Sequence, residues 1–120
     1  MIKKLIGTLL LSRDVSHVSH WKTDIYAHHI ALNEFYDEIL DKTDELVENY
    51  QGRHGILGDI PIMTNDRASG NIVRLLELYL KQIEDMRYKA VDKEDAALQS
   101  IMDEIVRIFL RTLYKLRQLK

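Results

Sequence analysis

Hydrophobic residues recur at three- and four-residue intervals in four stretches of the chain, which is the period of an α-helix with one buried face. The stretches run from near the N-terminus to Trp21, from about Ile25 to Tyr50, over about 71–90, and from about 92 to the basic C-terminal residues. Their expected core positions include Leu5, Leu9, Leu32, Phe35, Ile39, Leu46, Leu75, Leu76, Ile83, Leu98, Met102, Ile105, Phe109 and Leu113. The pattern predicts an all-α protein of four packed helices.

The breaks between these stretches predict how the helices connect. After Trp21 the break is short, and Thr23 or Asp24 would cap the second helix. The third and fourth helices are joined by a similarly short link. Between Gln51 and Ser69 the periodicity fails and glycines recur, with Gly52 expected to end the second helix. One long crossover between two tight hairpins is typical of a ferritin-like four-helix bundle.

Length and composition limit the remaining possibilities. A chain of 120 residues has one hydrophobic core, so residues 1–120 are expected to form a single domain. There is no Cys, so a bound metal would need imidazole and carboxylate ligands. The net charge of -2 gives no basic field for non-specific nucleic-acid binding. No stretch reaches the ~20 apolar residues of a membrane span, which predicts a cytoplasmic protein.

Four of the five histidines lie within thirteen residues around the first helix junction: His17, His20, His28 and His29. Clustered imidazoles are typical of metal sites, although histidines also collect by chance at junction surfaces. The di-iron site of many helical bundles uses Glu-x-x-His motifs, and the chain contains none. That form of metal site is therefore excluded.

Two carboxylates complete the candidate ligand set. Asp44 and Glu48 lie four residues apart, on the same flank of the second helix. Asp44 is fifteen residues from His29, about 22 Å along a straight helix, so one chain cannot bring them to one ion. If two copies of this helix pack antiparallel about a two-fold axis near Asp37 and Glu38, His29 faces the acidic turn of the other copy. Mixed nitrogen and oxygen ligands suit ferrous iron, with zinc, manganese and cobalt as competitors. The alternative is an ordinary solvated helix edge.

Together these residues resemble the Dps family, the dodecameric mini-ferritins of bacteria. His20 followed by Trp21 is similar to the end of the family's first helix, and His29 with Tyr36 is similar to its second-helix pair. The Asp-x-x-x-Glu pair, fifteen residues after His29, keeps the family's spacing. A weaker likeness covers most of the chain.

The resemblance implies a ferroxidase centre shared between two subunits, with His20 and His29 from one and Asp44 and Glu48 from the other. Ferrous iron would be oxidised there by hydrogen peroxide or oxygen and stored in a dodecamer built from two-fold dimers, which would protect against oxidative damage. Zinc would bind as a surrogate. Trp21 would take up an oxidising equivalent, although a bulky aromatic at a helix junction is also expected to pack.

The chain departs from the family pattern at three points. Asn33 stands where the family has a further Asp, which leaves open whether a site holds one iron ion or two. The linker after Trp21 is shorter than usual, and Asp24 or His28 is expected to compensate if His20 is displaced. The Lys-rich tail that family members use to hold DNA is missing, so only basic residues at helix ends remain for that role.

Three functions follow from these observations. The first is an iron-binding and iron-storing ferroxidase. The second is a ferritin-like oligomer without turnover that acts as a structural or DNA-protecting assembly protein, for which Asn33 is the main argument. The third is a helical interaction domain that binds no metal.

Overall fold

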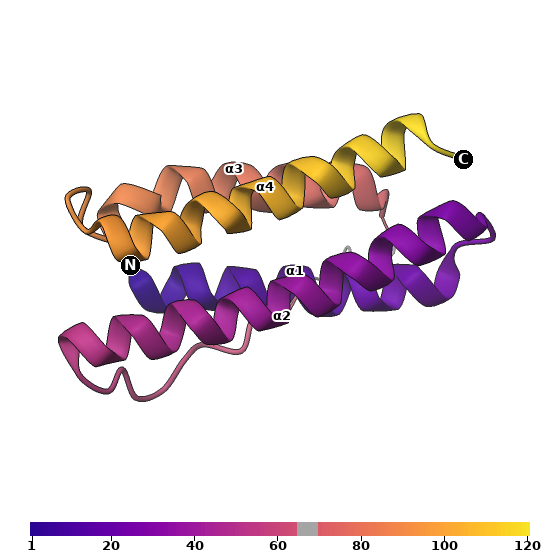
Figure 1. The fold of residues 1–120 in the computed structure, drawn as a ribbon. Coiled ribbons are helices and arrows are strands. Elements are labelled where there is room, and N and C mark those ends of the chain that lie inside the picture. The colour runs from indigo at the N-terminus through magenta and orange to yellow at the C-terminus, as the bar shows by residue number, and fades with distance from the viewer. Residues whose placement is uncertain (65–69) are drawn as a thin grey trace.

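The computed structural model describes residues 1–64 and 70–120 and contains four α-helices in that part of the chain (Figure 1). They are α1 (Ile2–Lys22), α2 (Tyr26–His54), α3 (Ile72–Ala90) and α4 (Ala96–Gln118). The described residues include no β-strand. None of the helices described here is long and apolar enough to cross a membrane. The predicted all-α four-helix bundle is confirmed.

Two predicted details at the ends of α2 are wrong. Gly52 lies inside the helix, which ends instead at Gly55, where a φ of 89° favours glycine. At the other end, neither Thr23 nor Asp24 is the N-cap, because that position belongs to Ile25 and has no side-chain cap. The Thr23 hydroxyl instead accepts the Ile25 backbone N–H at 3.2 Å.

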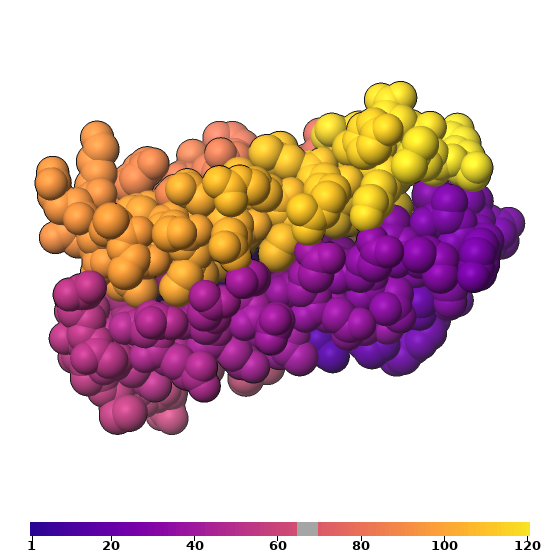
Figure 2. All heavy atoms as spheres, viewed as in Figure 1, coloured from indigo at the N-terminus to yellow at the C-terminus, as the bar shows by residue number. Residues whose placement is uncertain are grey.

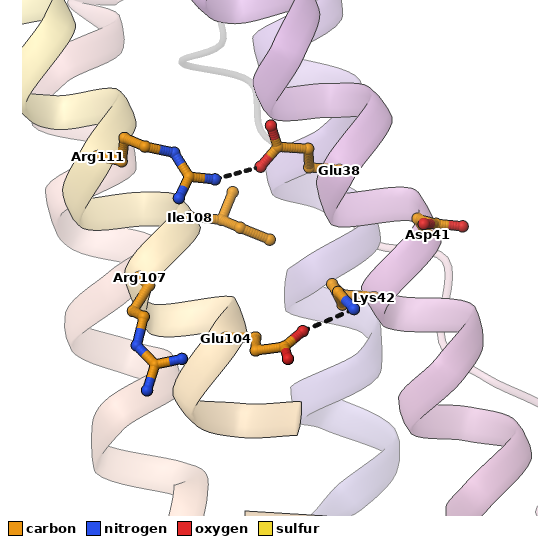
Figure 3. Close-up of a pocket in the computed structure, with 7 residues that line it drawn as sticks. All are labelled: Glu38, Asp41, Lys42, Glu104, Arg107, Ile108 and Arg111. Carbon is orange, nitrogen blue, oxygen red and sulfur yellow. Dashed lines mark hydrogen bonds and ion pairs between the residues drawn. The ribbon is translucent and has the colours of Figure 1, made fainter. Parts of the chain in front are cut away.

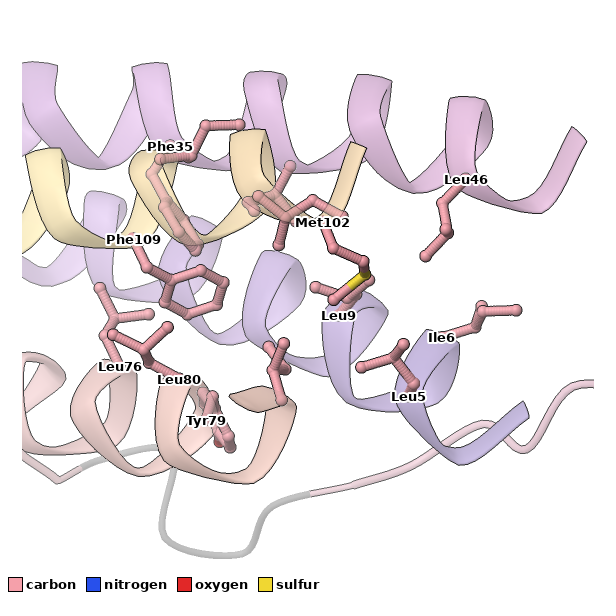
Figure 4. Close-up of a cluster of buried hydrophobic side chains, with 14 of the residues drawn as sticks. Leu5, Ile6, Leu9, Phe35, Leu46, Leu76, Tyr79, Leu80, Met102 and Phe109 are labelled. Carbon is pink, nitrogen blue, oxygen red and sulfur yellow. The ribbon is translucent and has the colours of Figure 1, made fainter. Parts of the chain in front are cut away.

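The helices form two hairpins that pack against each other (Figure 1). Helix α1 contacts α2 and α3, and α4 contacts the same two helices, so α1 and α4 lie diagonally across the bundle. Side chains from all four helices fill the centre (Figure 4), among them Leu5, Leu9, Phe35, Leu46, Leu76, Tyr79, Met102 and Phe109. Phe35 and Phe109 meet edge to face, with ring centroids 4.9 Å apart, which is a favourable aromatic geometry.

Helix α1 is buried around its whole circumference near its start. Every residue from Leu5 to Leu9 is buried, a stretch longer than one helical turn. The long connection supplies the outer cover, because Pro61 and Met63 lie against Gly7. The buried Thr8 hydroxyl donates to a carbonyl oxygen of its own helix at 2.9 Å, so its burial leaves no hydrogen-bonding group unsatisfied. The segment of the connection that contains Pro61 and Met63 is therefore packed against α1.

Gly7→Ala should destabilise the protein. An added Cβ would lie 2.9 Å from the Met63 sulfur and 3.0 Å from the Pro61 carbonyl oxygen, so the connection would have to move. We expect a loss of about 1–2 kcal/mol in urea unfolding, since overpacking outweighs the gain in helix propensity. The matched control is Gly52→Ala, where a Cβ meets nothing within 4 Å and a gain of up to about 1 kcal/mol is expected. Equal gains in both variants would contradict the packed connection.

Ion pairs join α2 to α4 along their shared edge, where Figure 2 shows the two helices side by side. The pairs are Lys115–Glu34, Arg111–Glu38 and Lys42–Glu104, each with an N···O distance of 2.6 Å. The last two border a groove of about 280 Å³ whose floor is Ile108 (Figure 3). Exposed pairs contribute at most about 1 kcal/mol each, so their main effect is to fix how the helices align.

The Lys42–Glu104 pair should make stability depend on pH. The Lys42 ammonium group hydrogen-bonds the Glu104 carboxylate and holds its pKa below the ordinary value of 4.5, while Glu104 raises the pKa of Lys42. A depressed carboxyl pKa contributes stability above pH 4.5 that is lost as the pH falls through the folded-state value.

Glu104→Gln should therefore lower the free energy of unfolding at pH 7 and reduce its dependence on pH in the acid range, as measured by urea unfolding. Glu94→Gln is the control, because the Glu94 carboxylate has no hydrogen bond or ion pair among the described residues. The same acid dependence in both variants would show that the pair does not stabilise the fold.

Candidate functional site

Two of the clustered histidines form a reciprocal pair where α1 ends and α2 begins. The rings of His20 and His29 stack with centroids 3.7 Å apart and an interplanar angle of 18°. The Nδ1 atom of His20 lies 2.6 Å from the His29 carbonyl oxygen, and the Nδ1 atom of His29 lies 2.9 Å from the His20 carbonyl oxygen. His20 is only 7% exposed, so the pair is held between the helices.

These hydrogen bonds determine the state of both imidazoles. A carbonyl oxygen can only accept, so each Nδ1 must carry the hydrogen, and each neutral ring then has its lone pair on Nε2. An imidazole whose other N–H is bound to a backbone carbonyl is a typical metal ligand, because its tautomer and orientation are already set. Each ring therefore presents one nitrogen donor. Because an imidazole binds a metal in the plane of its ring and these two rings stack nearly parallel, one ring has to turn before both donors can reach the same ion.

The pair also stabilises the hairpin without any metal. The His20 carbonyl lies in the last turn of α1, where carbonyl groups lack intrahelical partners. The His29 side chain supplies the missing donor, while the Thr23 backbone N–H bonds the Ser19 carbonyl at 3.1 Å. Capping of this kind accounts for the hydrogen bonds as a structural feature of the α1–α2 hairpin.

A second aromatic layer lies beside the histidine pair. The ring of His17 stacks on that of Tyr36 with centroids 4.0 Å apart, and Tyr36 meets His20 edge-on at 5.4 Å. Trp21 contacts the outer side of His17 at 4.5 Å and is 67% exposed. Trp21 therefore lies at the surface next to the site, where both predicted roles, packing and uptake of an oxidising equivalent, remain predictions.

Asn33, expected as a weak metal ligand, forms hydrogen bonds to two neighbouring side chains. Its Oδ1 accepts the Tyr36 hydroxyl at 2.7 Å, and its Nδ2 donates to Asp37 at 3.1 Å. Arg13, which the sequence analysis did not single out, has its guanidinium group 5.7 Å from the centre of the Tyr36 ring. The one signal in the sequence for this contact is that Arg13 lies one helical turn before His17. The two hydrogen bonds of Asn33 hold the Tyr36 hydroxyl and the Asp37 carboxylate, which favours a positioning role for Asn33.

The predicted carboxylates lie elsewhere on α2. Asp44 and Glu48 are exposed and have no hydrogen bond or ion pair within the described part of the chain. The helix is continuous from Tyr26 to His54, so Asp44 stays about 22 Å along the axis from His29. Among the described residues, no group of three or more His, Cys, Asp or Glu side chains is arranged to hold a metal ion. One chain alone therefore supplies part of a site.

The two residues expected to compensate for a displaced His20 do not join the pair. Asp24 is exposed, and no hydrogen bond, ion pair or ring contact links it to His20 or His29 in residues 1–64 and 70–120. The Nε2 atom of His28 is buried without a hydrogen-bond partner. Because His20 stacks directly on His29, the pairing needs neither residue.

The reciprocal hydrogen bonds predict an unusual tautomer at two positions. In long-range ¹H–¹⁵N spectra at mildly alkaline pH, His20 and His29 should both carry hydrogen on Nδ1 and a free lone pair on Nε2. His54 is the control, because it has a ring contact with Tyr50 but no hydrogen bond to fix its tautomer. A hydrogen on Nε2 of either paired ring would contradict the geometry.

Comparison with known proteins gives a family but no activity. A family model described as a family of unknown function (DUF5856) matches residues 20–116. The chain is also similar to an uncharacterized 14.6 kDa protein from the mobD–ri intergenic region of Enterobacteria phage T4. The two are 26% identical over 111 residues, which cover 92% of this chain and 84% of the phage protein. No solved structure matches significantly.

These findings correct the assignment to the Dps family, which is wrong. The matched region contains every residue that carried the resemblance, from His20 to Glu48, yet it belongs to a different family model. The physical reason is that a few histidines and acids on one flank of an amphipathic helix fall into a given spacing readily. The expectations that depended on the family alone, a dodecameric shell, iron storage and DNA protection, lose that support.

Proposed function

The chain belongs to the family of unknown function DUF5856, and from its own residues we propose that it binds a first-row transition metal ion, with ferrous iron as the leading candidate, at His20 and His29. The observation that carries this proposal is the reciprocal pair of hydrogen bonds. They leave both Nε2 lone pairs free and set the tautomer of both rings, so metal binding requires a turn of one ring but no change of tautomer.

The remaining ligands come from a second copy of the chain. The exposed flank of α2 carries Asp37 just before its midpoint and Asp41, Asp44 and Glu48 in its C-terminal half. Its first turn has no acidic residue and its N-cap has no side-chain hydrogen bond. Antiparallel pairing of two α2 helices would place the acidic half of each against the positive end of the other.

Exposed apolar side chains support the same pairing. Tyr26, Ile30 and Leu40 lie on this flank of α2 and are 77%, 40% and 37% exposed. With a two-fold axis near Asp37, His29 faces the turn that contains Asp44 of the other copy. Each dimer would then hold two equivalent sites with nitrogen donors from one chain and oxygen donors from the other.

Oxidation of the bound iron is the further step of this proposal. Carboxylate oxygens are hard donors that stabilise ferric more than ferrous iron, whereas two neutral imidazoles suit the ferrous ion that enters. A site with both would bind ferrous iron and favour its oxidation by oxygen or hydrogen peroxide. Zinc would compete for the same ligands without turnover.

Anaerobic titration with ferrous iron tests binding. We expect His29→Ala and Asp44→Asn each to weaken affinity by about tenfold or more, because each removes a ligand. Asp44 is exposed and has no ion pair or hydrogen bond to any residue that the structure describes, so its substitution should leave folding unchanged. The matched controls are His54→Ala and Glu94→Gln, which remove a histidine and an acid far from the site.

Mixing variants tests whether two chains share the site. His29→Ala and Asp44→Asn proteins should each bind poorly, but mixed dimers contain one intact site and should recover up to half of the wild-type stoichiometry. No recovery after subunit exchange, with dimers present, would contradict a shared site.

Addition of peroxide or oxygen to the loaded protein then tests turnover. Rapid formation of ferric iron supports a ferroxidase, and binding without oxidation supports the alternative of an oligomer without turnover. No binding of ferrous iron or zinc by the wild type would leave the histidine pair as a structural cap.

A further inference from the structure

A second candidate site lies near the start of α1, between α3 and the long connection. It is a pocket of about 320 Å³, and three of the four methionines of the chain line it: Met1, Met63 and Met86. The fourth, Met102, is fully buried in the core. The pocket is separate from the histidine pair, since α1 places about 27 Å between its first residue, Ile2, and His20.

The interior of this pocket is apolar and adaptable. Met86 is 7% exposed, and the Met63 sulfur lies 4.0 Å from the Thr8 hydroxyl, next to the surface of Gly7. Methionine side chains are flexible and polarizable, so a methionine-lined cavity accommodates varied apolar groups. The volume is within the range of about 300–1,000 Å³ that small-molecule pockets occupy.

The rim carries two lysines and one aspartate. Lys4 from α1 and Lys89 from α3 both line the pocket, and neither ammonium group has an ion pair or hydrogen bond within the described residues. Asp85 also lines it, but Lys81 already binds that carboxylate at 3.3 Å. The rim therefore carries two ammonium groups that are available to an anion whose apolar part lies in the cavity.

We propose that this pocket binds an amphipathic anion, a medium-chain fatty carboxylate, with the alkyl chain among the methionines and the carboxylate at Lys4 and Lys89. An inorganic anion would gain nothing from the apolar interior. A neutral lipid would leave the two lysines without a partner. The chemistry of a fatty carboxylate matches both parts of the pocket.

Titration of ¹³C-methyl-methionine protein with decanoate, below the concentration at which it forms micelles, tests this inference. The methyl signals of Met63 and Met86 should shift and saturate, while that of Met102 should stay in place. Decanol, which has the same chain length and no charge, should bind about tenfold more weakly.

Lys4→Gln combined with Lys89→Gln should weaken decanoate binding by about tenfold and leave decanol binding unchanged. The matched control is Lys22→Gln combined with Lys120→Gln, which alters the net charge equally outside the pocket. The inference is overturned if decanoate and decanol bind equally, if both double variants behave alike, or if the signals of Met63 and Met86 do not move. None of these outcomes depends on metal binding at the histidine pair.

Discussion

The burial of α1 on all sides from Leu5 to Leu9 is the constraint on which the rest of the structure depends. A helix in a two-layer bundle normally keeps one face in water, yet from Leu5 to Leu9 no face of α1 is exposed. Helices α2 and α3 cover two sides, and the connection covers the outer side through Pro61 and Met63. The connection has to be long because α2 ends and α3 begins at opposite ends of the bundle (Figure 1). The same arrangement brings Met63 towards Met86 and creates the methionine pocket.

Much of the fold could be predicted from the sequence, because three of the helices are amphipathic and the periodicity of their apolar residues marks the buried face. The helix ends were less predictable, since Gly52 and Gly55 are both possible stops and only the backbone decides which adopts a positive φ. The packing of the connection on α1 was not predictable, because it depends on the absence of a side chain at Gly7. The spacing of apolar residues predicts which face of a helix is buried, but it does not predict which segment of the chain covers that face.

The candidate site was predictable in part. Clustering at the first helix junction indicated a metal site among four histidines, and the family resemblance singled out His20 and His29, whose rings stack in the structure. The reciprocal hydrogen bonds could not be predicted, since they depend on the backbone carbonyls of both helices. The family resemblance failed because it used the spacing of a few residues on helix flanks, whereas a family is defined by the whole matched region. What remains is a pair of histidines in a fixed tautomer and an acidic flank, Asp44 and Glu48, that lies too far along α2 to meet them in one chain.

The central claim is that the histidine pair supplies nitrogen ligands to a metal ion. Another copy of the chain supplies the remaining ligands. X-ray absorption spectroscopy of the protein loaded with one equivalent of ferrous iron under anaerobic conditions tests it most directly. The account predicts the multiple-scattering pattern of two imidazoles together with carboxylate oxygen at first-shell distances. A first shell of oxygen alone, without imidazole scattering, would contradict it and leave the pair as a cap on the α1–α2 hairpin.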